Sequence, residues 1–122
     1  MLGAGGVKRL ICIGTPEHAQ AVEGALDMRG APLAEQMNAL RSARCAIGPS
    51  SGPMHLASLC KCPHLVWCGG GKGERSTTAR RYARDWNPHG TVARTFECGS
   101  WQPPFDTVLA YVKKFLKVVP AC

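Results

Sequence analysis

The stretch that decides the fold of this chain runs from residue 43 to residue 59 and reads ARCAIGPSSGPMHLASL. Its apolar run Cys-Ala-Ile predicts a buried strand that stops at Gly48. Ser50 and Ser51 are residue types that cap helices, and Pro53 suits the first helical position, where its missing N–H is not needed. The stretch therefore predicts a strand, a tight polar turn and the start of a helix.

Such a turn suits an anion, because the first N–H groups of a helix are unpaired and carry a partial positive charge. Gly52 lets another group approach the backbone closely, and His55 adds a side-chain donor. The alternative is that these residues serve as caps and turn residues alone. We predict a phosphate-bearing ligand at this turn. The expected ligand-binding residues are Ser50, Ser51, Gly52, Pro53, Met54 and His55.

Outside this turn, apolar runs and helical spacing alternate along the chain. The expected elements are strand 7–14, a helix beginning at 15–17, a short strand at 26–29, helix 32–42, strand 45–48, helix 53–60, strand 64–68, strand 91–96 and a helix from residue 104. Alternating strands and helices favour an α/β fold in which helices cover a parallel sheet. We therefore expect one three-layer, Rossmann-like domain over residues 1–122.

Composition is that of an ordinary folded domain: 122 residues, 45% apolar and 19% charged. No apolar run reaches the length of a membrane span, and the N-terminus lacks a signal-peptide pattern, so we expect a cytoplasmic protein. The seven cysteines include no Cys-x-x-Cys pair. We interpret them as small buried hydrophobic residues in a reducing compartment, and we expect neither a metal nor a cofactor.

The formal net charge of +7 permits an anionic partner without identifying one. Positive residues are densest at 72–84, which fits a solvated face, a phosphate-facing surface or a nucleic-acid patch. Nucleic acid is the least favoured of these, because no recognised nucleic-acid motif is present. The glycine-rich residues 69–73 follow a predicted strand but fail the phosphate-loop pattern, so we expect a loop there.

Residues 50–57 also resemble the nucleotide-sugar site of glycosyltransferases of the heptosyltransferase family, family 9. Those enzymes carry an Asp-Ser/Thr-Gly-x-Met-His-x-Ala motif at a strand-to-helix turn, and Ser50 stands here at the acidic position. Residues 29–36 and 62–69 resemble two further blocks, Gly-x-x-Ser-Leu-x-Glu-Leu and Val-Pro-x-Val-Ala-Leu-Phe-Gly. The order and spacing of the blocks agree from about residue 8 to residue 69.

The resemblance implies one half of a GT-B enzyme. Members of the family have two Rossmann-like halves, of which the C-terminal half holds the nucleotide-sugar donor and the N-terminal half binds the acceptor. Transfer is metal-independent in this family. This chain resembles the donor half, and the acceptor half is absent from it. No catalytic residue is assigned, because no Ser-His-Asp or Cys-His arrangement can be argued from spacing.

Two functions from different classes follow. The first is a donor-binding domain for an ADP-heptose-like nucleotide sugar, which would need a separate acceptor-binding half to complete a hexosyl or heptosyl transfer. The second is a stand-alone or vestigial Rossmann-like protein whose role is binding or oligomerisation. We also expect a homodimer, because the missing half would leave apolar surface and a sheet edge uncovered.

Overall fold

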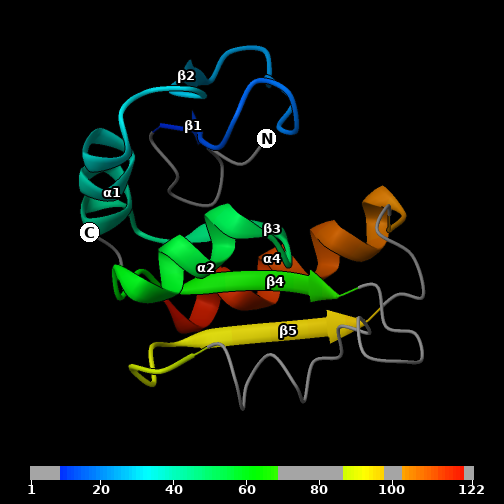
Figure 1. The fold of residues 1–122 in the computed structure, drawn as a ribbon. Coiled ribbons are helices and arrows are strands. Elements are labelled where there is room, and N and C mark those ends of the chain that lie inside the picture. The colour runs from blue at the N-terminus through cyan, green and yellow to red at the C-terminus, as the bar shows by residue number, and fades with distance from the viewer. Residues whose placement is uncertain (1–8, 69–86, 98–102, 120–122) are drawn as a thin grey trace, which may run out of the picture.

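A computed structural model describes residues 9–68, 87–97 and 103–119 of the chain (Figure 1). Within them the chain has an α/β fold with three helices and two small parallel sheets. The expectations for residues 69–73 and for the basic residues 72–84 lie outside the described part. None of the described helices is long and apolar enough to cross a membrane.

The larger sheet carries the core of the molecule. Its strands are β3 (Ala46–Pro49), β4 (His64–Cys68) and β5 (Ala93–Glu97), parallel and in the order β3-β4-β5. The central strand β4 is buried at four of its five positions. This explains its continuous apolar run, since a parallel strand covered on both faces has no solvent side.

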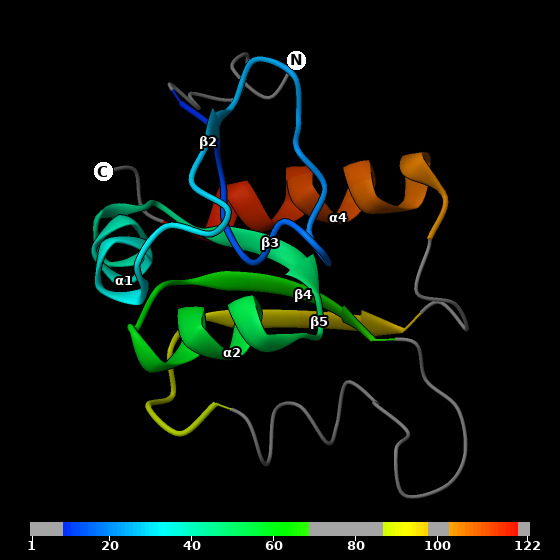
Figure 2. The same cartoon turned by 45° about the horizontal axis from the view of Figure 1, so that its top comes forward.

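Two helices cover the two faces of this sheet, α2 (Gly52–Leu59) and α4 (Phe105–Val118), as Figure 2 shows. Successive side chains of a strand point to opposite faces. Accordingly, Leu65 packs in the cluster formed with α4, whereas Val66 packs in the cluster formed with α2.

The end of α4 is tied to the segment before β3. The guanidinium of Arg44 donates from Nη2 to the carbonyl oxygens of Leu116, at 2.8 Å, and Val119, at 3.2 Å. The last carbonyls of a helix have no partner within the helix, and a cation beside them also interacts favourably with the helix dipole. Arg44 therefore fixes α4 against a segment more than 70 residues away in sequence.

The smaller sheet pairs β1 (Ile11–Cys12) with β2 (Leu26–Asp27) in parallel. The chain then forms α1 (Leu33–Ser42), whose Leu40 packs with Ala57 and Cys62 in a third apolar cluster. Ile13 packs against the same cluster. The end of β1 therefore lies beside the helices that flank the larger sheet.

The helix expected to begin at 15–17 is absent from the structure. Residues 15–19 form a single turn, in which the N–H groups of His18 and Ala19 donate to the Thr15 carbonyl. In a continuing helix, the Ala19 carbonyl would accept the N–H of the residue four positions later. Here it accepts instead from Nη1 of Arg29 at 2.8 Å. Val22, expected on an apolar stripe, is 55% exposed.

Other expectations agree with the structure except at their boundaries. The helix expected from residue 104 is α4, helix 53–60 is α2, strand 64–68 is β4 and the strand expected at 91–96 is β5. The structure differs in its sheets, because the described strands form two separate sheets where one was expected. The first strand was expected over 7–14, but pairing within the described residues covers two positions.

Candidate functional site

The predicted ligand turn lies between β3 and α2, at the carboxyl end of β3. The N–H of Ser50 donates to the Trp67 carbonyl at 2.9 Å, which ties the turn to β4. Ser51 is the N-cap of α2 in an extended conformation, and its carbonyl accepts the N–H groups of Met54, at 3.1 Å, and His55, at 3.0 Å. The sequence 50–55 thus forms the turn and helix start that were predicted.

The serines were predicted to cap the helix, and Ser51 does occupy the N-cap position. Its side chain makes no capping hydrogen bond, and its Oγ donates backward to the Pro49 carbonyl at 2.9 Å. The N–H of Gly52 has no hydrogen-bond acceptor among the described residues. Since Pro53 has no N–H, the first turn of α2 presents one open backbone donor at Gly52.

The space beside the Cα of Gly52 is open. Gly52 is exposed, and a Cβ added to it would meet nothing within 4 Å beyond its chain neighbours and the nearby backbone of α2. The neighbouring Gly48 differs, because a Cβ there would lie 3.1 Å from Sδ of Met54. Gly48 is therefore needed for packing, whereas Gly52 is free to face a ligand.

The side chains of Met54 and His55, two of the predicted ligand-binding residues, have different surroundings. Met54 is 4% exposed and packs with Val66 and Cys68, so its side chain belongs to the core. His55 is half-buried, and desolvation lowers its pKa. Near neutral pH its imidazole is therefore uncharged and can act as a hydrogen-bond donor without carrying a cation's charge.

A second glycine turn lies against the first. Gly14 follows β1 with a φ of +112°, and a Cβ there would lie 3.4 Å from Cγ of Pro53 and 3.1 Å from Cβ of Ala19. The buried carboxamide of Gln36 accepts from the N–H of Gly14 at 3.0 Å. Its Nε2 donates to the carbonyls of Gly14, at 3.4 Å, and Ala31, at 2.9 Å.

Sequence reasoning missed both Gly14 and Gln36 as residues that shape this site. The signal for Gln36 was present, because it lies four residues before Leu40 and thus falls on the apolar stripe of α1. A polar side chain at a core-facing position needs a buried partner. Sequence spacing does not show that this partner is Gly14, which lies 22 residues away.

An ion pair closes the same edge at the end of β2. Arg29 contacts Asp27 at 2.9 Å, and hydrogen bonds from Arg29 lower the pKa of Asp27 to about 2. The adjoining Gly30 donates its N–H to the Gly14 carbonyl at 2.8 Å. The ends of β1, β2 and β3 thus converge, and Arg29 is engaged by Asp27.

This arrangement can bind an anion through the backbone N–H of Gly52 and a neutral imidazole. Among the described residues, no group of three or more His, Cys, Asp or Glu side chains is placed to hold a metal ion. The five cysteines within the described ranges form no disulfide. No pair of side chains at the turn forms an acid–base couple with a nucleophile, so the geometry supports binding and assigns no catalytic residue.

Comparisons with protein-family models, with curated proteins and with solved structures found no match to this chain. The resemblance to family 9 glycosyltransferases therefore rests on the sequence blocks around residues 29–36, 50–57 and 62–69.

Proposed function

We propose that this chain is a nucleotide-sugar donor-binding domain, related to the donor half of heptosyltransferase-like GT-B enzymes, with an ADP-heptose-like ligand. The observation that carries the proposal is Gly52 at the first turn of α2, which is exposed and whose N–H has no acceptor among the described residues. A helix N-terminus favours phosphate, and glycine allows a phosphate oxygen to approach the backbone. The sequence motif occupies this same turn.

The surrounding architecture supports the same ligand class. In open α/β sheets, ligands bind in the crevice beyond the carboxyl ends of the strands. Here the turns after β1, β2 and β3 meet, and Gly14 brings its backbone against Pro53. Helices on both faces of the larger sheet fit the three-layer, Rossmann-like half that the resemblance implies.

The test adds ADP-glucose or UDP-glucose to the whole chain and measures the melting temperature by thermal unfolding. We expect both to raise the melting temperature and His55→Ala to reduce the shift. Binding should also tighten as the pH falls toward the lowered pKa of His55, since a bound anion favours the protonated imidazole. The pyrophosphate diester keeps its charge over this range, so the pH effect would come from the protein. Unchanged melting temperatures with both nucleotide sugars would contradict the proposal.

We expect the purified chain alone to transfer no sugar. The 122 residues resemble the donor half, and in the family the acceptor half excludes water and supplies an acid or base. The measurement is release of nucleoside diphosphate from ADP-glucose or UDP-glucose. Release above the no-protein rate that disappears in His55→Ala would show that this chain is a complete enzyme.

Self-association is the second candidate role, and exposed apolar side chains favour it. Leu33 is 63% exposed, Phe105 61% and Leu59 58%. The apolar stripe of α4 itself is largely used within the chain, since Val112 and Phe115 are buried. We expect a homodimer in sedimentation at micromolar concentration. A single species of 13.1 kDa would contradict this.

A further inference from the structure

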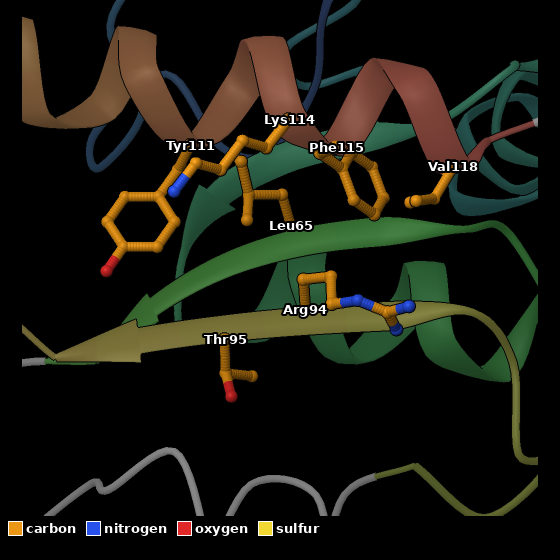
Figure 3. Close-up of a pocket in the computed structure, with 7 residues that line it drawn as sticks. All are labelled: Leu65, Arg94, Thr95, Tyr111, Lys114, Phe115 and Val118. Carbon is orange, nitrogen blue, oxygen red and sulfur yellow. The ribbon is translucent and has the colours of Figure 1, made fainter.

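A pocket of about 230 Å³ lies between β5 and α4, on the face of the sheet opposite α2 (Figure 3). Leu65 and Phe115 line it, and they are 1% and 2% exposed. Arg94 and Thr95 line it from β5, and Tyr111, Lys114 and Val118 line it from α4. Because α2 and α4 cover opposite faces, this pocket is separate from the Gly52 turn.

One side of the pocket is an aromatic wall formed by the Tyr111 ring, which is stacked on Phe96 outside the lining. The rings of Phe96 and Tyr111 stack with centroids 4.1 Å apart and planes inclined by 2°. The ammonium of Lys114 lies 6.0 Å from the centre of the Tyr111 ring, within the range of a cation–π interaction. The wall presents a fixed apolar surface with a cation at its edge.

The pocket carries two cations and no acidic side chain among the described residues that line it. Lys114 lies toward the Tyr111 end, and the guanidinium of Arg94 extends toward Val118 (Figure 3). Arg94 donates from Nη1 to the carbonyl of its neighbour Ala93 at 3.0 Å. Neither cation forms a salt bridge with any described residue, so both can pair with an incoming anion.

We infer that this pocket binds a small amphipathic carboxylate, with an aryl or alkyl body over Leu65 and Phe115. The carboxylate pairs with the guanidinium of Arg94, whose planar fork matches two oxygens at once. Lys114 contributes the second positive charge. The chemistry follows from an apolar surface edged by two cations that form no salt bridge with a described residue, which favours a ligand that is apolar along its body and negative at one end.

A second copy of the chain is a poor occupant of this pocket. A two-fold dimer brings the same patch of both copies together. Arg94 and Lys114 of one copy would then face Arg94 and Lys114 of the other, with no described lining carboxylate to neutralise them. Charge therefore favours an anionic ligand over self-association at this face.

The test uses 4-phenylbutyrate and its neutral amide, titrated into the whole chain while backbone amide resonances are followed. We expect saturable shifts in β5 and α4 with a Kd on the order of 1 mM for the acid. The amide should bind about fivefold more weakly, because it keeps the apolar body and lacks the charge. ADP-glucose should not compete, which separates this site from the donor site.

Matched variants separate the pocket from general surface charge. Arg94→Gln and Lys114→Gln remove exposed cations of the pocket, and Arg41→Gln removes an exposed cation of α1. We expect Arg94→Gln to raise the Kd by about fivefold, and Arg41→Gln to leave it unchanged. The inference is wrong if acid and amide bind equally, if Arg94→Gln has no effect, or if no saturable shift occurs up to about 20 mM ligand.

Discussion

Replacing Phe115 by alanine is expected to lower the free energy of unfolding by about 3–5 kcal/mol. Phe115 is 2% exposed and joins α4 to the larger sheet. Its apolar cluster consists of Leu65, Phe96, Val112, Phe115 and Val119. Truncation loses the transfer free energy of the ring and leaves a cavity that strands on one side and a helix on the other cannot close. A loss of this size is a large part of the whole stability of a small domain.

The matched control is Phe105→Ala, the same substitution in the first turn of the same helix. Phe105 is 61% exposed, so its replacement should change the free energy of unfolding by less than about 1 kcal/mol. Urea unfolding followed by far-ultraviolet circular dichroism measures both. Phe115→Leu keeps most of the volume and should cost about 1 kcal/mol if the alanine variant fails to fold. Equal losses for the two alanine variants would contradict the placement of α4.

Acidification is expected to destabilise the protein as the pH falls from 6.5 toward the pKa that His64 has in the folded state, which is below 6.5. His64 is fully buried, and its Nδ1 lies 2.8 Å from the Cys62 carbonyl, which makes Nδ1 the donor of the neutral ring. Burial lowers the pKa of His64 by more than the hydrogen bond with the Cys62 carbonyl raises it, and His55 of α2 lowers it further. Burial also lowers the pKa of His55.

The direction follows from proton binding. In the unfolded chain, both histidines take up a proton as the pH falls through their ordinary pKa of 6.5, whereas in the folded chain they stay neutral. Stability is therefore complete above pH 6.5 and is lost as the pH falls toward the folded pKa values. Each histidine contributes at most about 1.4 kcal/mol per pH unit over that window.

The measurement is the free energy of unfolding from urea titrations at several pH values from 7.5 to about 4.5. His64→Asn should flatten the dependence, because an asparagine amide can still donate to the Cys62 carbonyl without titrating. The control is His18→Gln, at an exposed position. A stability that does not change over this range would show that His64 is not held neutral in the folded protein.

The sequence was sufficient to predict those elements whose structure is determined by residues within one segment. Strand β4 was predicted at its observed bounds, because Gly and Pro punctuate a short apolar run that is buried on both faces. Helix α4 was predicted because its apolar residues recur at helical spacing over four turns. The helix start at Gly52 was predicted to within one residue from the serine, glycine and proline pattern.

The predictions failed where residues distant in sequence determine the local structure. Residues 15–17 have a good helix-start pattern, but the Ala19 carbonyl is taken by Arg29 and the turn after Gly14 is held by Gln36. These partners come from the residues after β2 and from α1, so the pattern within the segment gives no sign of them. Ser51 differs for a local reason, because its hydroxyl donates to the Pro49 carbonyl two residues earlier and its side chain makes no capping hydrogen bond.

The central claim is that a nucleotide sugar binds at the open N–H of Gly52, and Gly52→Ala tests it most directly. A Cβ at this position meets nothing within 4 Å beyond its chain neighbours and the nearby backbone of α2, so the variant should fold with stability equal to or slightly above that of the parent. The added methyl group lies next to the backbone donor and should hinder the close approach of a phosphate oxygen that glycine allows. We predict that calorimetric titration with ADP-glucose shows binding to the parent and at least about tenfold weaker binding to Gly52→Ala. Equal affinity in the two proteins, with equal stability, would contradict the claim.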